Sequence, residues 1–322
     1  MRNELGRFSD FVADLHGRAR EADVETLIDW SVGALADIVG FDSAWYGWAE
    51  ISAEGVAIHA SATRDLPEGY YDFWTGVAEE DLLAAQILAD PERVAVYDRA
   101  GEAHTDGMRA LADAYGIRRM ATALRLREGR SASLFLSAYR GGAARAWSRS
   151  EREFLRCAVD QISHAAQAAR RWGEAPDDDA ATLLVGRDGV AILGLDRARR
   201  RFGDLWSKSA GDRLPRPLSD YVDAPGEHLL IDSGLVAICE TAGAADGLAL
   251  RKLTLRPMRK FDLLTPRERQ VARRLAEGES HKETARALGV SPSTIRNQTR
   301  SIYDKLGVEN RASLAQAVPP AA

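Results

Sequence analysis

The chain has 322 residues, of which 45% are hydrophobic and 28% charged, a composition typical of a globular protein with two or three domains. No apolar run approaches the length of about eighteen residues that a membrane span needs, and the two cysteines, Cys157 and Cys239, exclude a disulfide framework. The formal net charge is −5, yet residues 251–322 hold 15 lysines and arginines against 7 acidic residues, which indicates a polyanionic partner for the C-terminal part.

Residues 1–173 predict a first domain of mixed α/β type, with a charged N-terminus that lacks an apolar signal core. In chain order we expect helices over 4–18 and 23–39, then a strand hairpin over 42–51 and 55–62. A mainly helical stretch over 66–90 and a strand over 93–98 follow. The last elements are a hairpin over 118–140 that turns at Glu128–Gly129 and a helix over 149–171 that is capped by Ser148 and Glu151. Helices that flank a mainly antiparallel sheet make an α/β sandwich.

This order of elements resembles GAF domains and the autoinducer-binding domains of LuxR proteins, over roughly residues 20–170. The stretch "LPEGYYDFW" followed by Asp81 is similar to the family stretch in which aromatics and an aspartate hold an acyl-homoserine lactone. Leu82 stands where that family has proline, which argues against such a lactone. The resemblance implies a pocket for another small, largely apolar effector between sheet and helices.

Aromatic side chains supply contact area in such a pocket, and one carboxylate orients a polar end of the ligand. The candidate pocket residues are Tyr46, Trp48, Tyr70, Trp74, Asp81, Phe135 and Tyr139. Two alternatives stay open, because strand aromatics also serve as plain core and Asp81 also fits an exposed helix acid. His59 and His104 are isolated, and we expect core or solvent roles for them rather than metal ligation.

Residues 173–180 are acidic and rich in turn formers, and they predict a linker. Beyond it, residues 181–257 predict two strands over 182–195 around Asp188–Gly189, a helix over 196–206, a hairpin over 228–241 and a strand over 247–255. Strand, strand, helix and hairpin in this order resemble a degenerate PAS domain. The resemblance implies an element for coupling or dimerisation.

Helix-start signals divide residues 261–322 into four short helices, over about 266–277, 281–288, 292–306 and 311–317. The N-caps are Thr265, Ser280, Ser291 and Asn310, and Gly289 supplies the turn between the second and third helix. This spacing predicts a helix-turn-helix domain.

The third of these helices has two chemically different faces at about 100° per residue. Ile295, Thr299, Ile302 and Leu306 form the core face, whereas Arg296, Asn297 and Arg300 share the opposite face with Ser293 and Asp304. Arginine pairs with guanine and asparagine with adenine in the major groove, so these three side chains are the candidate base readers. The candidate phosphate contacts are Lys282, Ser293, Thr294 and Lys305.

Residues 263–318 closely resemble the LuxR/FixJ-type helix-turn-helix, in the TPRE start, the AEG, the KE of the scaffold helix, the VSPST entry and the KLGV exit. The resemblance implies that Arg296, Asn297 and Arg300 read bases and that the last helix dimerises around Leu314. Thr284 and Thr299 stand where the family has aliphatic residues, and Gln298 where it often has histidine.

We therefore expect a multi-domain α+β chain with a GAF-like α/β sandwich, a small PAS-like α+β segment and an all-α four-helix domain. The absence of any lysine before Lys208 disfavours a receiver domain, and the absence of a Gly-Lys pair disfavours an ATPase module. The expected protein is a cytoplasmic, homodimeric, ligand-responsive transcription regulator without cofactor or metal, whose partners are a two-fold site on double-stranded DNA, a small effector and RNA polymerase. Control by a protein partner is the alternative. An additional enzymatic activity is disfavoured, since no catalytic motif such as G-x-S-x-G is present.

Overall fold

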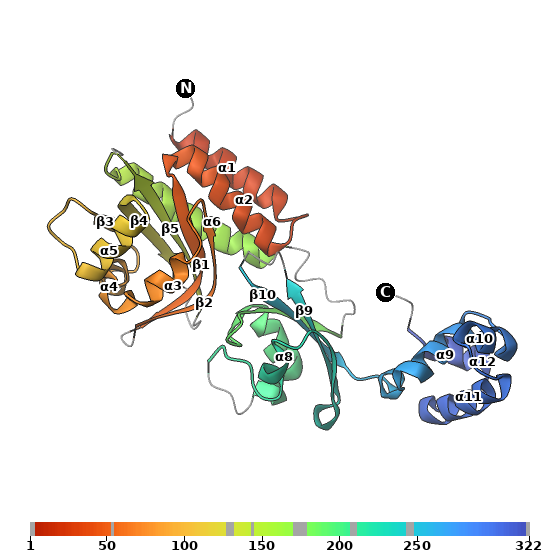
Figure 1. Ribbon diagram of the computed structural model, residues 1–322. Coiled ribbons are helices and arrows are strands. Elements are labelled where there is room, and N and C mark those ends of the chain that lie inside the picture. The colour runs from red at the N-terminus through yellow and green to blue at the C-terminus, as the bar shows by residue number, and fades with distance from the viewer. Residues whose placement is uncertain are drawn as a thin grey trace. The chain divides into compact units, whose positions relative to one another are not determined.

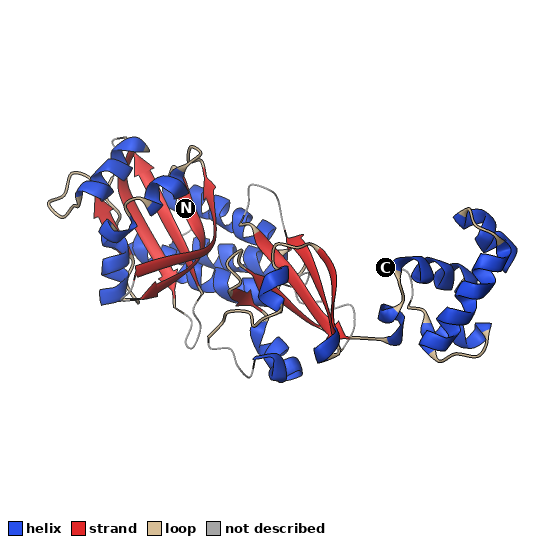
Figure 2. Ribbon diagram, turned by 60° about the horizontal axis from the view of Figure 1, so that its bottom comes forward, coloured by secondary structure: helices blue, strands red, loops and turns tan. Residues whose placement is uncertain are grey.

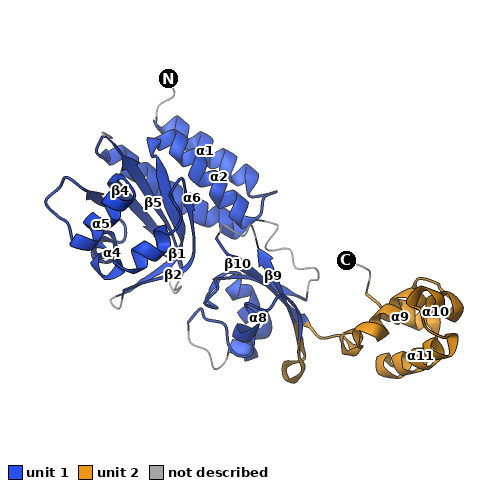
Figure 3. Ribbon diagram, in the orientation of Figure 1, with its two compact units in different colours: residues 1–228, 237–256 blue, residues 229–236, 257–322 orange. Residues whose placement is uncertain are grey.

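The computed structural model describes residues 4–52, 55–126, 132–142, 145–169, 179–206, 211–242 and 248–319. The chain divides into two compact units, residues 1–228 with 237–256 and residues 229–236 with 257–322 (Figure 3). The region predicted as sensor lies in the first unit together with the predicted PAS-like segment, apart from residues 229–236 and 257 of that segment. Most of the predicted linker over 173–180 and the turn at Glu128–Gly129 lie outside the described residues.

The first sheet has five strands in the order β2-β1-β5-β4-β3, and each neighbouring pair is antiparallel. The strands are β1 (Ser43–Ser52), β2 (Gly55–Arg64), β3 (Ala95–Asp98), β4 (Ile117–Arg125) and β5 (Ser133–Gly141). The two hairpins and the short strand predicted from the sequence are confirmed.

Helices cover both faces of this sheet, as expected for an α/β sandwich (Figure 1). One face carries α1 (Glu4–Arg18), α2 (Val24–Leu35), which continues as a π-helical turn over Ala36–Gly40, and α6 (Arg149–Ala168); the other carries α3 (Tyr70–Thr75), α4 (Leu82–Ala89) and α5 (Asp106–Ala114). The predicted capping box of Ser148 and Glu151 is present at α6. Helix α5 was not predicted, although Met108, Leu111 and Ala112 recur at helical spacing and are buried.

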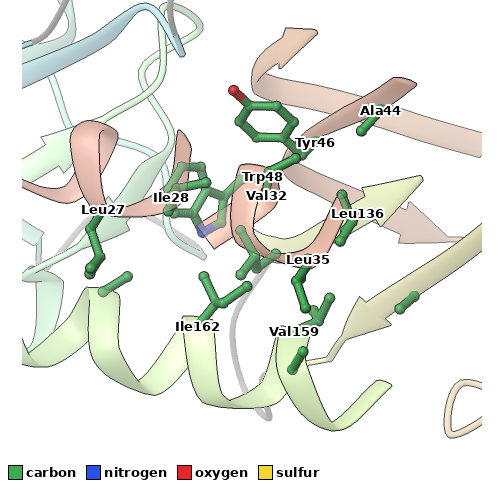
Figure 4. Close-up of a cluster of buried hydrophobic side chains, with 14 of the residues drawn as sticks. Leu27, Ile28, Val32, Leu35, Ala44, Tyr46, Trp48, Leu136, Val159 and Ile162 are labelled. Carbon is green, nitrogen blue, oxygen red and sulfur yellow. The ribbon is translucent and has the colours of Figure 1, made fainter. Parts of the chain in front are cut away.

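Alternation along the strands separates two apolar cores, one on each face of the sheet. Figure 4 shows the core under α2 and α6, where Tyr46, Trp48 and Leu136 of the sheet meet Val32 and Ile162 of the helices. The second core lies under α3, α4 and α5 and contains the neighbouring strand residues of opposite parity, Trp45, Phe135 and Tyr139 among them.

The second sheet of this chain repeats the strand order of the first, with β7-β6-β10-β9-β8 (strands in red in Figure 2). Its elements are β6 (Ala181–Val185), β7 (Ala191–Leu193), α8 (Leu195–Trp206), a 3-10 turn over Leu218–Tyr221, β8 (Gly226–Leu230), β9 (Leu235–Ala242) and β10 (Leu250–Pro257). The sequence of strand, strand, helix, hairpin and strand predicted for residues 181–257 is confirmed.

A β-bulge in β2 ties the two sheets together within the first unit. Trp48 pairs with Ala60 and Ala49 with Ile58, so His59 is the extra residue. The Nδ1 atom of buried His59 lies 2.7 Å from Oδ2 of Asp188, in the turn between β6 and β7. Burial raises the pKa of Asp188, but the His59 contact, the Val190 N–H and the nearby Arg213 together outweigh it, and the net pKa is lowered. The histidine that the sequence left isolated thus has a partner 129 residues away.

The C-terminal helices are α9 (Pro266–Ala276), α10 (His281–Leu288), α11 (Pro292–Leu306) and α12 (Arg311–Ala317), preceded by a 3-10 turn over Lys260–Leu263. All four predicted helices are confirmed, and each predicted N-cap side chain accepts a backbone hydrogen bond three residues on. Their packed faces enclose one apolar core that includes Val271, Leu275, Ile295, Ile302 and Leu314.

A charged cluster joins the start of α9 to the end of α11. The Glu268 carboxylate is only 8% exposed and accepts hydrogen bonds from Lys305 at 2.7 and 2.8 Å, from Ser301 at 3.0 Å and from the Thr265 backbone N–H at 2.9 Å. Burial alone raises the pKa of Glu268, but these hydrogen bonds outweigh it and lower the pKa to about 2. Folding therefore favours the ionised carboxylate.

We predict that Gly47→Ala destabilises the first unit by at least about 2 kcal/mol, measured by chemical denaturation of the full chain. A Cβ at Gly47 would lie 2.0 Å from the Ala60 carbonyl oxygen and 2.7 Å from Ser61 Cα, and backbone atoms cannot move aside cheaply. The matched control is Gly17→Ala inside α1, which meets nothing within 4 Å and should be neutral or stabilising by about 0.5–1 kcal/mol. Equal effects of the two substitutions would contradict the close approach of β1 and β2.

We also predict that Glu268 makes the second unit sensitive to acid. The pKa of Glu268 is lower folded than unfolded, so its stabilisation is present above its ordinary value of 4.5 and is lost as the pH falls toward 2. Glu268→Gln should lower the melting temperature at pH 7, and the gap to the wild type should narrow as the pH falls from about 5 to about 2. A pH-independent gap between the two melting curves would show that the carboxylate charge contributes nothing.

Candidate nucleic-acid interface and sensor cavity

Helix α11 is held with one face inward and the other in solvent. Gly289 adopts φ +66° at the end of α10, a left-handed conformation that favours glycine and closes the turn before α11. Ile295, Thr299, Ile302 and Leu306 are buried, as predicted. The hydroxyls of the two threonines that replace aliphatic residues are satisfied, since Thr299 donates to the Ile295 carbonyl at 2.7 Å and Thr284 to Glu279 at 3.2 Å.

The outward face of α11 presents Arg296, Asn297 and Arg300, all exposed. Across the described ranges, none of the three side chains makes a hydrogen bond or an ion pair. Other arginines of this unit hold the fold instead. Arg267 donates to the Leu288 carbonyl at 2.8 Å and Arg311 to the Leu275 carbonyl at 2.7 Å. The three candidate base readers are therefore among the side chains that make no contribution to the described fold.

The four predicted phosphate contacts divide in two groups. Lys282, Ser293 and Thr294 are exposed beside the outward face, with the Ser293 and Thr294 hydroxyls 2.7 and 2.8 Å from Ser291 Oγ. Lys305 is engaged differently, because its ammonium group pairs with Glu268. A phosphate contact by Lys305 would compete with an ion pair inside the domain.

The predicted dimerisation residue requires correction. Leu314 is 0% exposed and packs in the core of its own chain, where its side chain cannot reach a second copy. The exposed residues of α12 are Arg311, Ala312, Ala315 and Gln316. The prediction chose the most apolar residue of the helix, and that residue was needed to close the domain's own core.

A largely apolar cavity of about 40 Å³ lies between the first sheet and α3, α4 and α5. Five predicted pocket residues line it, namely Tyr70, Trp74, Asp81, Phe135 and Tyr139. The prediction for Tyr46 and Trp48 is wrong, because both point to the opposite face and pack under α2 (Figure 4). Tyr46 donates there to Asp29 at 3.0 Å.

Polar groups at this cavity are mostly paired with one another. Asp81 is the N-cap of α4 and accepts from the Leu83 N–H at 2.8 Å and from Trp74 Nε1 at 2.9 Å. The hydroxyls of Tyr70 and Tyr139 are 2.7 Å apart, and burial raises the pKa of both, so these phenols stay protonated and supply no base. The Trp45 indole N–H is different, since it is buried at the cavity without a partner in the described structure.

Trp45 was not predicted as a pocket residue because β1 has aromatic residues at both odd and even positions, 45, 46 and 48, which point to opposite faces of the sheet. The register with β5 determines which of these faces borders the cavity. Gly47 lies opposite Phe135 and Trp45 opposite Ser137, and cross-strand partners share a face of the sheet. The ring centroids of Trp45 and Phe135 are 4.9 Å apart. A correct pairing of the two strands would have placed Trp45 with Phe135.

No helix in the described part of the chain is both long and apolar enough to cross a membrane.

Solved structures similar to this chain include the N-acylhomoserine lactone dependent LuxR family factor CepR2 from Burkholderia cenocepacia, 18% identical over 51% of this chain and 94% of that one, with a TM-score of 0.38. SdiA in complex with octanoyl-rac-glycerol is 14% identical over 99% and 97%, with a TM-score of 0.34. A phycoerythrobilin-bound GAF domain from a cyanobacterial phytochrome is 15% identical over 52% and 96%, with a TM-score of 0.37. All three TM-scores lie below 0.5, so these similarities assign neither a ligand nor a function to this chain.

Sequence relatives match the C-terminal helices. The transcriptional regulatory protein UhpA of Escherichia coli is 49% identical over 55 residues, or 17% of this chain and 28% of that protein. The probable transcriptional regulatory protein NarL of Mycobacterium tuberculosis is 43% identical over 51 residues, or 16% and 24%. The chain thus spans about a quarter of the length of these curated relatives. Residues 262–318 match the family model described as bacterial regulatory proteins, luxR family. Together with the four capped helices, this match identifies residues 262–318 as a domain of the luxR family.

Proposed function

We propose that the protein is a sequence-specific DNA-binding transcription regulator in which α11 enters the major groove. Arg296 and Arg300 donate to guanine edges there and Asn297 pairs with adenine. The luxR-family match of residues 262–318 supports this function, because its curated relatives are transcriptional regulators. Lys282, Ser293 and Thr294 contact the flanking phosphates.

The observation that carries the proposal is that some polar side chains of the second unit make hydrogen bonds within the domain, whereas others are exposed and make none. Arg267, Arg269 and Arg311 satisfy backbone carbonyls and hold the helices together. Arg296, Asn297 and Arg300 contribute nothing to the described fold, although they occupy neighbouring positions on one exposed helix face. Two like charges four residues apart on a helix repel each other, so this set of donors destabilises the free domain. A partner with matching acceptors would compensate for that repulsion.

We further propose that the protein binds a two-fold site as a homodimer and recruits RNA polymerase there. Ala312, Ala315 and Gln316 are small or uncharged exposed residues of α12. The neighbouring Arg311 donates to the Leu275 and Glu279 carbonyls of its own domain, which leaves the other three exposed residues for a close helix contact between two copies. These residues take the place of Leu314 in the proposed dimer.

The first unit is proposed to sense a small, largely apolar molecule in the cavity beside α3, α4 and α5. The cavity's apolar lining and the unpartnered Trp45 N–H support this, because a ligand carbonyl would satisfy that donor. A volume of about 40 Å³ is far below the roughly 300–1,000 Å³ of typical small-molecule sites, so we propose that a ligand of ordinary size displaces the covering helices. The same small volume favours the alternative, in which a protein partner rather than a metabolite controls the regulator.

Arg296→Ala is predicted to weaken binding to a selected operator by about 1–3 kcal/mol, or about 5- to 150-fold, because a bidentate contact to one base is lost. The measurement is fluorescence anisotropy of the full chain at fixed salt, on an operator selected from random DNA. Arg20→Ala is the matched control, since it removes the same charge from an exposed position in the first unit. Unchanged operator affinity of Arg296→Ala would refute the assignment of α11 to the groove.

Native mass spectrometry of the purified chain, before and after mild denaturation, is predicted to release a small molecule only on unfolding. Trp45→Phe should reduce the bound fraction, because it removes the unpartnered indole N–H and preserves most of the ring volume. Trp147→Phe is the control, since that indole belongs to the core on the opposite face. A spectrum free of ligand, together with unaltered operator binding by Trp45→Phe, would favour control by a protein partner.

A further inference from the structure

A second hollow, of about 370 Å³, lies on the first unit between the segment that follows α4 and the first turns of α6. It is polar, unlike the cavity under α3, and its volume falls in the range typical of small-molecule sites. Four arginines line it, Arg93, Arg149, Arg152 and Arg156. Neither the luxR-family domain nor the proposed effector cavity includes any of these side chains.

Two of the three carboxylates that line the hollow, Glu92 and Glu153, lie near Arg156. Arg156 lies 2.6 Å from Glu153 and 3.8 Å from Glu92, and the hydrogen bond from Arg156 lowers the pKa of Glu153. Of the lining carboxylates this leaves Asp90, the residue that ends α4. The other three arginines, Arg93, Arg149 and Arg152, have no carboxylate within ion-pair distance in the described structure. Four arginines against three carboxylates leave the lining with one excess positive charge.

The position of these arginines in α6 is unfavourable for the helix itself. Arg149 and Arg152 lie in its first turn, where the partial positive charge of the helix dipole repels cations. Residues 149, 152 and 156 also share one helix face, so their like charges repel one another. Glu153, four residues after Arg149 on the same face, offsets part of this repulsion, since Arg149, in addition to Arg156, helps to lower the pKa of Glu153. A bound anion would relieve both repulsions, with Arg93 closing the site from the opposite side.

We propose that this hollow binds a small polyanion carrying at least two oxyanion groups, of the size of pyrophosphate or larger. Arg149, Arg152 and Arg93 donate charge-assisted hydrogen bonds to the oxyanions, since guanidinium groups match such oxygens in fork geometry. Asp90 accepts from a hydroxyl or protonated oxygen of the ligand. Because α4 lines the apolar cavity with Leu83, Ala84 and Ile87 and ends at this hollow, ligands at the two sites contact the same helix.

The test is isothermal titration calorimetry of the full chain with inorganic pyrophosphate, against sodium chloride of equal ionic strength. All titrations use an Arg296→Gln/Arg300→Gln background, since the exposed arginines of α11 also attract anions. We expect one bound pyrophosphate per chain, and at least about tenfold weaker binding when Arg149→Gln and Arg152→Gln are added. Arg18→Gln with Arg20→Gln is the control pair in the same unit and should leave the affinity unchanged. Citrate in a parallel titration distinguishes phosphate from carboxylate oxyanions as the preferred group.

Melting temperature supplies an independent readout. Without ligand, Arg149→Gln/Arg152→Gln should melt close to its background, because the two repelled charges it removes offset the lost attraction between Arg149 and Glu153. A lower melting temperature would identify these arginines as structural and overturn the proposal. Heats no larger than those of matched sodium chloride, or equal affinity in the Arg149→Gln/Arg152→Gln and control variants, would also overturn it. Because α11 is already altered in every sample, these outcomes are independent of whether the chain binds DNA.

Discussion

The pairing of β1 with β5 is the constraint on which the first unit depends. Gly47 lies opposite Phe135, and this register sets which side of the sheet each neighbouring side chain occupies. Tyr46 and Trp48 then face α2 and α6, where burial anchors the helices, whereas Trp45 and Phe135 face the cavity. A shift by one residue would exchange the two sets. On its other edge β1 pairs with β2, and there Gly47 approaches the Ala60 carbonyl so closely that only a residue without a Cβ fits.

The second unit relies on a different device, in which polar side chains satisfy the ends of short helices. Helices of seven to fifteen residues are marginal in isolation. Thr265, Ser280, Ser291 and Asn310 cap them, and arginines reach carbonyl oxygens at the ends of their neighbours. The Glu268–Lys305 pair joins the first of these helices to the third. Because local caps and a small core suffice, the outward face of α11 remains open to other chemistry.

This difference explains how much could be predicted from the sequence. Caps are local, so the four C-terminal helices were predicted to within a residue of their observed ends. The arrangement of the cavity depends on strand register and on distant partners, which composition and spacing do not reveal. Tyr46 and Trp48 were assigned to the wrong face for that reason, and the contact of His59 with Asp188 across 129 positions was not predicted. Leu314 shows a further limit, since an apolar residue near a chain end suits a core and an interface equally well.

The small volume of the apolar cavity has a thermodynamic consequence for any molecule that enters it. The open form must be populated before or during binding, and the apparent dissociation constant rises by the reciprocal of its population. If the cavity were open in about 1% of molecules, the apparent affinity would be about a hundredfold below the intrinsic one. The same closed state would hold the protein in its ligand-free form at low ligand concentration. Substitutions that loosen α3, α4 or α5 would then raise the apparent affinity without touching the ligand.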